Sequence, residues 1–154
     1  MKNEERRMIN RAREIQQVVM RCLLEESRVP YTDVEEWTAT QAFLTQSIGE
    51  LLKQEGSTPN EEGERLLAIL MGYTIAVRNR RNIAVALEQA ERVIPQITDK
   101  LLKCKLAVYC YGECLDEELG MMAHRFIEEQ KLCGNPKEVA CLEELLMNFS
   151  CSIY

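Results

Sequence analysis

The sequence predicts an all-α fold, and three observations lead to this prediction. The 154-residue chain contains only seven glycines and four prolines, so few residues interrupt regular structure. Apolar residues recur at the spacing that places them on one face of a helix, and no stretch alternates in the pattern of a strand. Helix-start signals also repeat along the chain. We therefore expect about seven helices in a single domain, residues 1–154.

The first two helices are expected to form an N-terminal pair within residues 1–57. Pro30 disfavours helical structure at the residue before it and so separates the two. Thr32 and Glu35 form a capping-box pattern that opens the second helix, which should continue to Gly56. The first helix, over about residues 4–27, carries on one face Ile15, Val18, Val19, Cys22 and Leu23. The apolar residues of the second helix are Val34, Trp37, Leu44, Ile48 and Leu51.

The third and fourth helices are predicted from caps and stop signals. Thr58 suits the N-cap of the third helix, Pro59 its first helical position, and Glu61 follows the cap by three residues. This helix should run to about Arg78, with an inward face of Leu66, Leu67, Leu70, Tyr73, Thr74 and Val77. Asn82 suits the N-cap of the fourth helix, which should end near Pro95 with an apolar face of Ile83, Leu87, Ala90 and Ile94.

The last three helices follow the same logic. The fifth should cover about residues 98–111, because Gly112 suits a left-handed C-terminal cap. Asp116 suits the N-cap of the sixth, which stops at the sequence CGNP. Asn135 and Pro136 then repeat the cap-and-proline signal of the third helix. The apolar face of the seventh helix consists of Val139, Leu142, Leu146 and Phe149.

A weak internal repeat refines the expected architecture. Segments 89–94 and 122–127 share alanine, arginine and isoleucine at an offset of 33 residues. This offset is close to the period of tetratricopeptide helical hairpins. We therefore expect two tetratricopeptide-like helical hairpins within residues 58–154, packed on the N-terminal pair.

Composition excludes some classes of function. The formal net charge of -6 argues against a general phosphate-binding surface, although Arg78 to Arg81 form a local basic cluster that suits a solvated turn. The N-terminus lacks the pattern of a secretory signal, and the longest apolar run, residues 66–77, is too short to cross a bilayer. Seven irregularly spaced cysteines suggest reduced thiols rather than a disulfide framework. These features predict a cytoplasmic protein.

The residues that could carry chemistry lie between Leu101 and Glu129. Cys104, Cys110, Cys114 and His124 could be drawn as metal ligands, but no C-x-x-C pair occurs, and buried cysteine is common in cores. His124 is the only histidine, so any cysteine–histidine mechanism would depend on it. No phosphate-binding, metalloprotease or nucleophile-elbow motif is present. We therefore expect no enzyme activity, no metal and no cofactor.

A family resemblance covers about half of the chain, from about Thr58 to Gln130. It is carried by LLAILMGY at 66–73, LLKCKL at 101–106 and CYGECLDEEL at 110–119, followed by Ala123 and His124. In order and separation these segments resemble the UpxZ family of capsule-locus regulators. The resemblance implies a cytoplasmic inhibitor of transcription antitermination that acts on UpxY, a NusG-like antiterminator, from other capsular polysaccharide loci.

The resemblance assigns no binding residue, so the contact is inferred from residue type. Aromatic and acidic side chains at a helix turn suit a basic, nucleic-acid-associated partner. The candidate partner-binding residues are Tyr109, Tyr111, Glu113, Asp116, Glu117 and Glu118. Alternatively, the tyrosines belong to the core or line a groove, and the acids only favour the helix start.

Two other functions remain open at this point. A tetratricopeptide-like adaptor would bind an extended peptide in a concave groove. A DNA-binding regulator would use the turn at Arg78 to Arg81, which the net charge of -6 disfavours.

Overall fold

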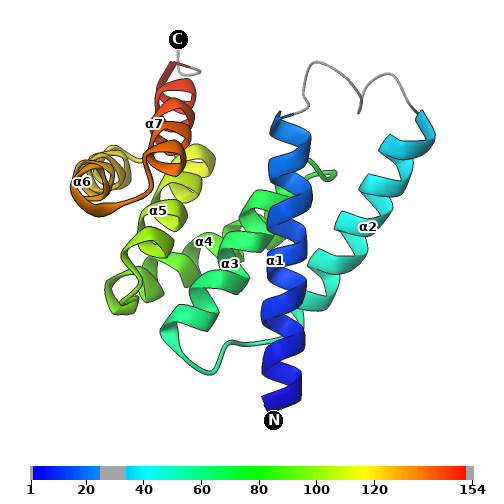
Figure 1. Ribbon diagram of the computed structural model, residues 1–154. Helices are drawn as coiled ribbons and strands as arrows, with labels where there is room; N and C mark the ends of the chain where they lie inside the picture. Colours follow the sequence, from blue (N-terminus) through cyan, green and yellow to red (C-terminus); the bar gives the residue numbers. More distant parts are fainter. Residues whose placement is uncertain (1, 25–33, 152–154) are drawn as a thin grey trace.

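The computed structural model describes residues 2–24 and 34–151. In these ranges the chain forms seven α-helices and one short 3₁₀ helix, with no strand, which confirms the all-α prediction (Figure 1). The elements are α1 (Lys2–Leu24), α2 (Val34–Leu52), α3 (Pro59–Tyr73), α4 (Arg80–Val93), η1 (Ile94–Gln96), α5 (Lys100–Cys114), α6 (Glu117–Cys133) and α7 (Pro136–Cys151). Among them, no helix combines the length and the apolar character needed to span a bilayer.

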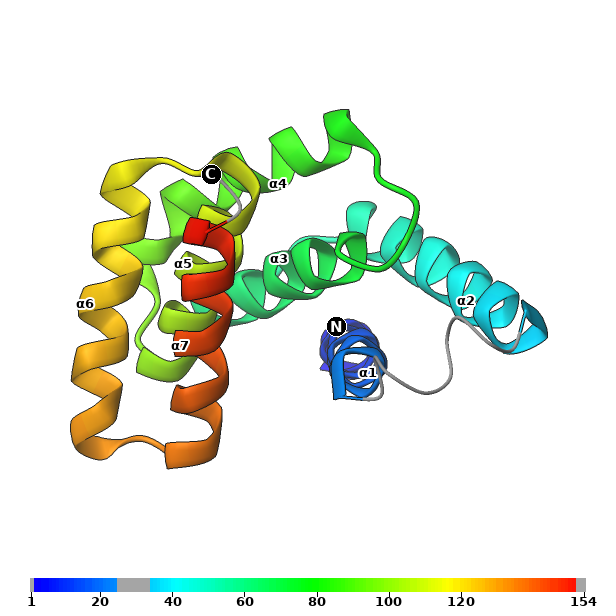
Figure 2. The ribbon, with the colours of Figure 1, turned by 90° about the horizontal axis from the view of Figure 1, so that it is seen from above.

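Helix α3 is the centre of the fold. It packs against α1, α2, α4 and α5, whereas α5 in turn packs against α6 and α7. Figure 2 shows the result: α1 and α2 lie on one side of α3, and the group of α5, α6 and α7 lies on the other. The interior position of α3 explains its sequence, since residues 65–73 are all buried. Burial of each such leucine or isoleucine side chain stabilises the folded state by roughly 1.5–3 kcal/mol relative to leaving it exposed.

Helix α1 is amphipathic and packs more extensively on α3 than on its neighbour in sequence, α2. Ile15 and Val19 are fully buried, as expected from their spacing, and Val18 and Leu23 are partly buried against the core. In α2, Leu44, Ile48 and Leu51 are buried, again as expected, but Val34 is exposed because it stands at the first position of the helix. The expected capping role of Thr32 lies outside the described residues.

Three predicted N-caps are present. The Thr58 hydroxyl accepts from the backbone N–H of Glu61 at 3.2 Å, directly before Pro59 at the helix start. The Asp116 carboxylate accepts from the N–H of Glu118 at 2.8 Å, and Asn135 starts α7 by accepting from the N–H of Lys137 at 2.9 Å. These caps satisfy donors that the first turn of each helix would otherwise leave open.

The predicted cap of the fourth helix was wrong by three residues. Asn79, not Asn82, is the N-cap of α4, and its side-chain oxygen accepts from the N–H of Asn82 at 3.0 Å. Asn82 instead lies in the first turn and donates its amide to the Tyr73 hydroxyl at 2.9 Å. The two asparagines therefore have different roles: Asn79 caps α4, and Asn82 links α4 to Tyr73 at the end of α3.

The predicted end of the third helix, at Arg78, was also wrong. Helix α3 ends at Tyr73, and Thr74 and Val77, expected to face inward, are exposed. The cause is a contact from α2: the Gln41 amide donates to the carbonyl of Ile75 at 2.7 Å and accepts from the N–H of Val77 at 3.2 Å. A side chain from another helix thus satisfies the backbone of the turn, which removes the need for helical bonds.

The predicted C-cap of the fifth helix was wrong as well. Helix α5 begins at Lys100 with Asp99 as its cap and continues through Gly112 to Cys114. Leu115 takes the left-handed conformation, with φ at 55°, although a leucine there is strained. Gly112 serves packing instead, because a Cβ at this position would lie 2.6 Å from the ring of Phe149 on α7.

Candidate functional site

The thiols and the histidine that could carry chemistry are not brought together. Cys104 and Cys110 are fully buried, and burial raises the pKa of the Cys104 thiol to about 11 and that of Cys110 further still. His124 is exposed, and its Nε2 lies 3.9 Å from Oε1 of Glu128, one turn along α6. No group of three or more histidine, cysteine, aspartate or glutamate side chains within residues 2–24 and 34–151 could hold a metal ion.

The six sequence-predicted partner-binding residues divide into two sets. Tyr109 and Tyr111 are buried, with 4% and 7% of their surface exposed, and Glu113 lies beneath the surface in an ion pair with Arg78. The remaining three carboxylates, at the start of α6, are exposed: Asp116, Glu117 and Glu118. The turn between α5 and α6 therefore presents acids to solvent, whereas both tyrosines are buried residues of α5.

The basic cluster at 78–81 is partly neutralised. Arg78 donates to both carboxylate oxygens of Glu113 and, at 3.4 Å, to the carbonyl of Tyr73. The hydrogen bond that Arg78 donates to Glu113 raises the pKa of Arg78 above its ordinary value. This pair ties the start of α4 to the end of α5, so Arg78 holds two segments of the fold together.

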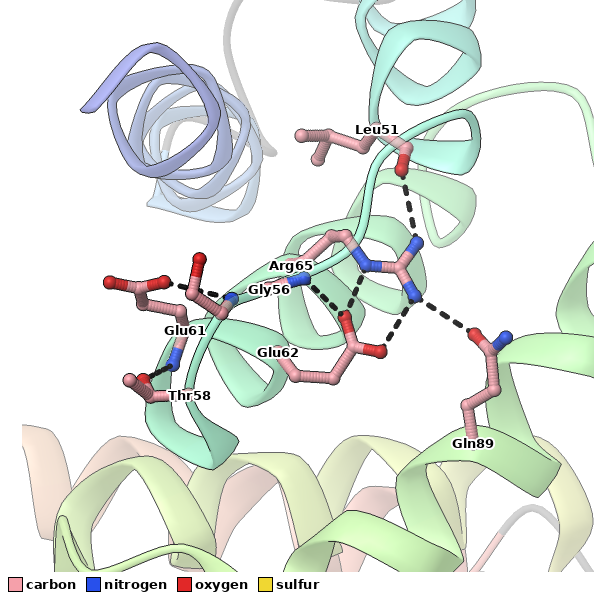
Figure 3. Close-up of polar contacts among 8 residues, drawn as sticks. Leu51, Gly56, Thr58, Glu61, Glu62, Arg65 and Gln89 are labelled. Carbon is pink, nitrogen blue, oxygen red and sulfur yellow. Dashed lines mark hydrogen bonds and ion pairs between the residues drawn. The ribbon is translucent and has the colours of Figure 1, made fainter. Parts of the chain in front are cut away.

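A buried cluster around Arg65 was not found from sequence (Figure 3). The guanidinium donates to the carbonyl of Leu51 at 3.0 Å, to the side chain of Gln89 at 2.9 Å and to both oxygens of Glu62. Glu62 also accepts from the N–H of Gly56 at 3.2 Å. Because these bonds join α2, α3, α4 and the loop after α2, the cluster is a structural one. It also explains why α2 stops at Leu52 rather than at Gly56.

A surface groove with a volume of about 490 Å³ lies between α1 and α7. We call it the α1–α7 groove. Its apolar lining comes from three helices, namely Met20 of α1, Met71 of α3, and Leu142 and Leu145 of α7. Its volume falls within the range of ligand pockets, roughly 300–1,000 Å³. Sequence reasoning missed this groove because α1 and α7 lie at opposite ends of the chain.

The rim of the α1–α7 groove is mainly cationic. Arg13 and Arg21 line it from α1, and Lys105 and Glu138 line it from α5 and α7. Lys105 Nζ lies 3.7 Å from Oε1 of Glu138, whereas neither arginine has an ion-pair partner among the described side chains. In a chain with a net charge of -6, this surface therefore carries a local excess of positive charge.

Tyr109 also lines the α1–α7 groove, and its hydroxyl is an unusual feature of the fold. The oxygen is buried and has no hydrogen-bond partner among the described residues. Its ring packs edge-on against Phe149, with centroids 6.4 Å apart and planes at 67°. Burial raises the pKa of Tyr109. Most buried polar side-chain atoms have a hydrogen-bond partner, so a buried hydroxyl without one, in a residue that lines a groove, calls for an explanation.

Comparison with known proteins gives two matches. The model of the UpxZ family of transcription anti-terminator antagonists matches residues 12–112, a range that includes most of α1 and ends within α5. The crystal structure of a transcription anti-terminator antagonist UpxZ from Bacteroides uniformis is similar to this chain, with a TM-score of 0.82 and 28% sequence identity. The alignment covers 96% of this chain and 94% of that one. No curated protein sequence matches the chain.

Proposed function

The chain belongs to the UpxZ family of transcription anti-terminator antagonists, and we propose that its targets are NusG-like anti-terminators of the UpxY type. In this proposal the protein acts in trans, in the cytoplasm, on the anti-terminators of capsular polysaccharide loci other than its own. Such an activity would favour the expression of one capsule at a time.

One observation carries the proposal. The likeness to the Bacteroides uniformis antagonist extends over nearly the whole of both chains at a TM-score of 0.82. The two proteins thus share every packed layer of the fold rather than one hairpin, and the family match over residues 12–112 points to the same class of regulator.

Antagonism by binding, without catalysis, fits the chemistry of the described residues. The buried thiols have raised pKa values and are shielded from substrates, and His124 has a single carboxylate beside it. Activation of a nucleophile requires a base and an orienting group in contact with it. We therefore propose that the protein inhibits by occupying a surface of the anti-terminator.

The turn between α5 and α6 is the contact surface that we propose for a basic face of the partner. Asp116, Glu117 and Glu118 present three exposed acids there. Tyr111 supports the turn from within, since its hydroxyl lies 3.2 Å from that of Ser150 on α7, and Glu113 is held by its ion pair with Arg78. Acidic groups on a firmly held turn favour encounter with a basic partner and fix its orientation.

The test is binding of the purified chain to purified UpxY-type proteins, both from its own locus and from other loci, by isothermal titration calorimetry. Micromolar or tighter binding to proteins from other loci, with loss of read-through in a transcription assay, is expected. Binding to none of them by a folded sample would refute the proposed function.

A paired variant tests the acidic turn separately. Glu117→Gln with Glu118→Gln removes two exposed charges, and Glu35→Gln with Glu36→Gln removes the same charges from the first turn of α2. We expect only the first pair to weaken binding, by roughly three- to tenfold at low salt. Equal affinities for the two pairs would exclude the turn from the interface.

A further inference from the structure

We propose that the α1–α7 groove binds a short segment of the antagonised anti-terminator, one that carries apolar side chains flanked by aspartate or glutamate. The identity of this partner rests on the proposed function. The proposal itself rests on the groove, on the positive charge of its rim and on the Tyr109 hydroxyl, which lacks a hydrogen-bond partner among the described residues. The groove would be a second contact surface, separate from the acidic turn.

The shape of the groove suits an apolar segment. Its floor includes Met71 of α3, and its sides carry Met20 of α1 and the leucines 142 and 145 of α7. Methionine adapts to irregular apolar partners and is common at such surfaces. Helix α1 is held by α3, whereas α7 is held by α5 and α6, so each side of the groove is fixed without help from the other. The groove is therefore formed before a partner arrives.

Tyr109 lines the groove, and its buried hydroxyl is a polar group without a partner among the described residues. A buried donor without an acceptor is unfavourable, and the fold does not relieve it among the described residues. A backbone carbonyl of a segment lying in the groove would accept this hydrogen bond once the side chains that cover the oxygen move aside. The same contact would fix the register of the segment, as a small number of polar groups does in apolar binding sites.

The rim charge identifies the flanking residues of the segment as acidic. Arg13 and Arg21 stand on the exposed side of α1 and lack ion-pair partners among the described residues, while Lys105 shares its charge with Glu138. Three cations against one carboxylate at the rim attract carboxylates. Arginine also binds carboxylates in a two-pronged geometry, which adds specificity.

Charge reversal at the rim tests the proposal in the full-length chain. Arg13→Glu with Arg21→Glu should weaken binding to the UpxY-type protein by at least about tenfold at low salt, with a smaller effect at high salt. The matched control is Arg80→Glu with Arg81→Glu, which makes the same change at exposed positions of α4. The control should retain affinity within about twofold.

A second variant keeps the test independent of charge. Tyr109→Phe removes the hydroxyl and keeps the ring packed on Phe149. It should weaken binding several-fold while the melting temperature stays equal or rises, because no hydrogen bond within the described fold is lost. A lower melting temperature with unchanged affinity would mean that the hydroxyl stabilises the fold itself and would overturn its role in the groove.

The outcomes separate the groove from the proposed function. If the unaltered chain binds no anti-terminator, the proposed function fails. If it binds, and both groove variants bind equally well, the function stands and the groove proposal is overturned. Two further results would overturn it in favour of another occupant: dimers of the chain that dissociate in the Arg13 and Arg21 variant, or nucleic acid binding that the same variant abolishes.

Discussion

Replacement of Arg65 by methionine tests whether the buried cluster at the junction of α2, α3 and α4 holds the fold together. The change keeps an unbranched apolar side chain in place of the arginine stem but removes all its donors. The carbonyl of Leu51 and the side chain of Gln89 would lose their donors, and the carboxylate of Glu62 would lose its cation. Arg65 is only 2% exposed, so water cannot replace it directly.

The expected loss follows from these three groups. An unsatisfied buried acceptor costs about 1–3 kcal/mol, and the Leu51 carbonyl fits this case best. Gln89 is half-buried and can turn toward water, and the Glu62 side chain is 22% exposed and keeps the Gly56 N–H, so each loses less. We expect the free energy of unfolding to fall by about 3 kcal/mol, at the lower end of the range for breaking one side of a buried pair.

Urea unfolding followed by circular dichroism measures this loss. The control is Arg92→Met, which removes an exposed pair with Glu88 on α4 and should change stability by less than about 0.5 kcal/mol. Adding Glu62→Gln to the Arg65 variant should recover about 1 kcal/mol, because the uncompensated charge is then gone. A loss below about 1 kcal/mol for Arg65→Met would refute the assigned role.

Three further predictions concern packing, protonation and the accessibility of thiols. Gly112→Ala should lower the free energy of unfolding by about 1–3 kcal/mol, because the added methyl group would meet the ring of Phe149. Gly49→Ala, with open space around the added methyl group, should raise the free energy of unfolding by up to about 1 kcal/mol. Urea unfolding measures both variants, and equal effects on stability would exclude the clash with Phe149. Cys104, whose folded-state pKa is raised to about 11 from 9.0, stays protonated when the unfolded chain ionises, so stability should fall as pH rises from 9 toward 11. Ellman's reagent at pH 8 should label exposed Cys133 at once and Cys104 only on unfolding, and rapid labelling of Cys104 would show that the core opens locally.

Much of the fold could be predicted because its signals are local. Thr58, Asp116 and Asn135 each cap a helix through a backbone N–H two or three residues away, and such contacts are readable from sequence. The end of α3 could not be predicted, since it depends on Gln41 of α2. Gly112 was assigned a turn for its conformational freedom, but the fold uses its lack of a side chain.

The candidate site was less accessible to sequence reasoning. The sequence predicts Tyr109 as a partner-binding residue because it is aromatic and lies near acids, but the structure places it in the lining of the α1–α7 groove rather than on the acidic turn. The acids after residue 115 are exposed, but whether they bind a partner stays a prediction. Arg13 and Arg21 gave no signal of their own, since arginine at the surface of a charged helix is ordinary. Their significance depends on α7, which begins more than a hundred residues later.

The packing of α1 on α3 has a consequence for the order in which the chain folds. Helix α1 packs mainly on the central helix α3 and less on α2, although α2 is synthesised before α3. During synthesis the apolar face of α1 therefore has no complete partner until α3 has left the ribosome. Nascent chains that stop between the two helices would expose this face, and we expect them to be the species most dependent on chaperones.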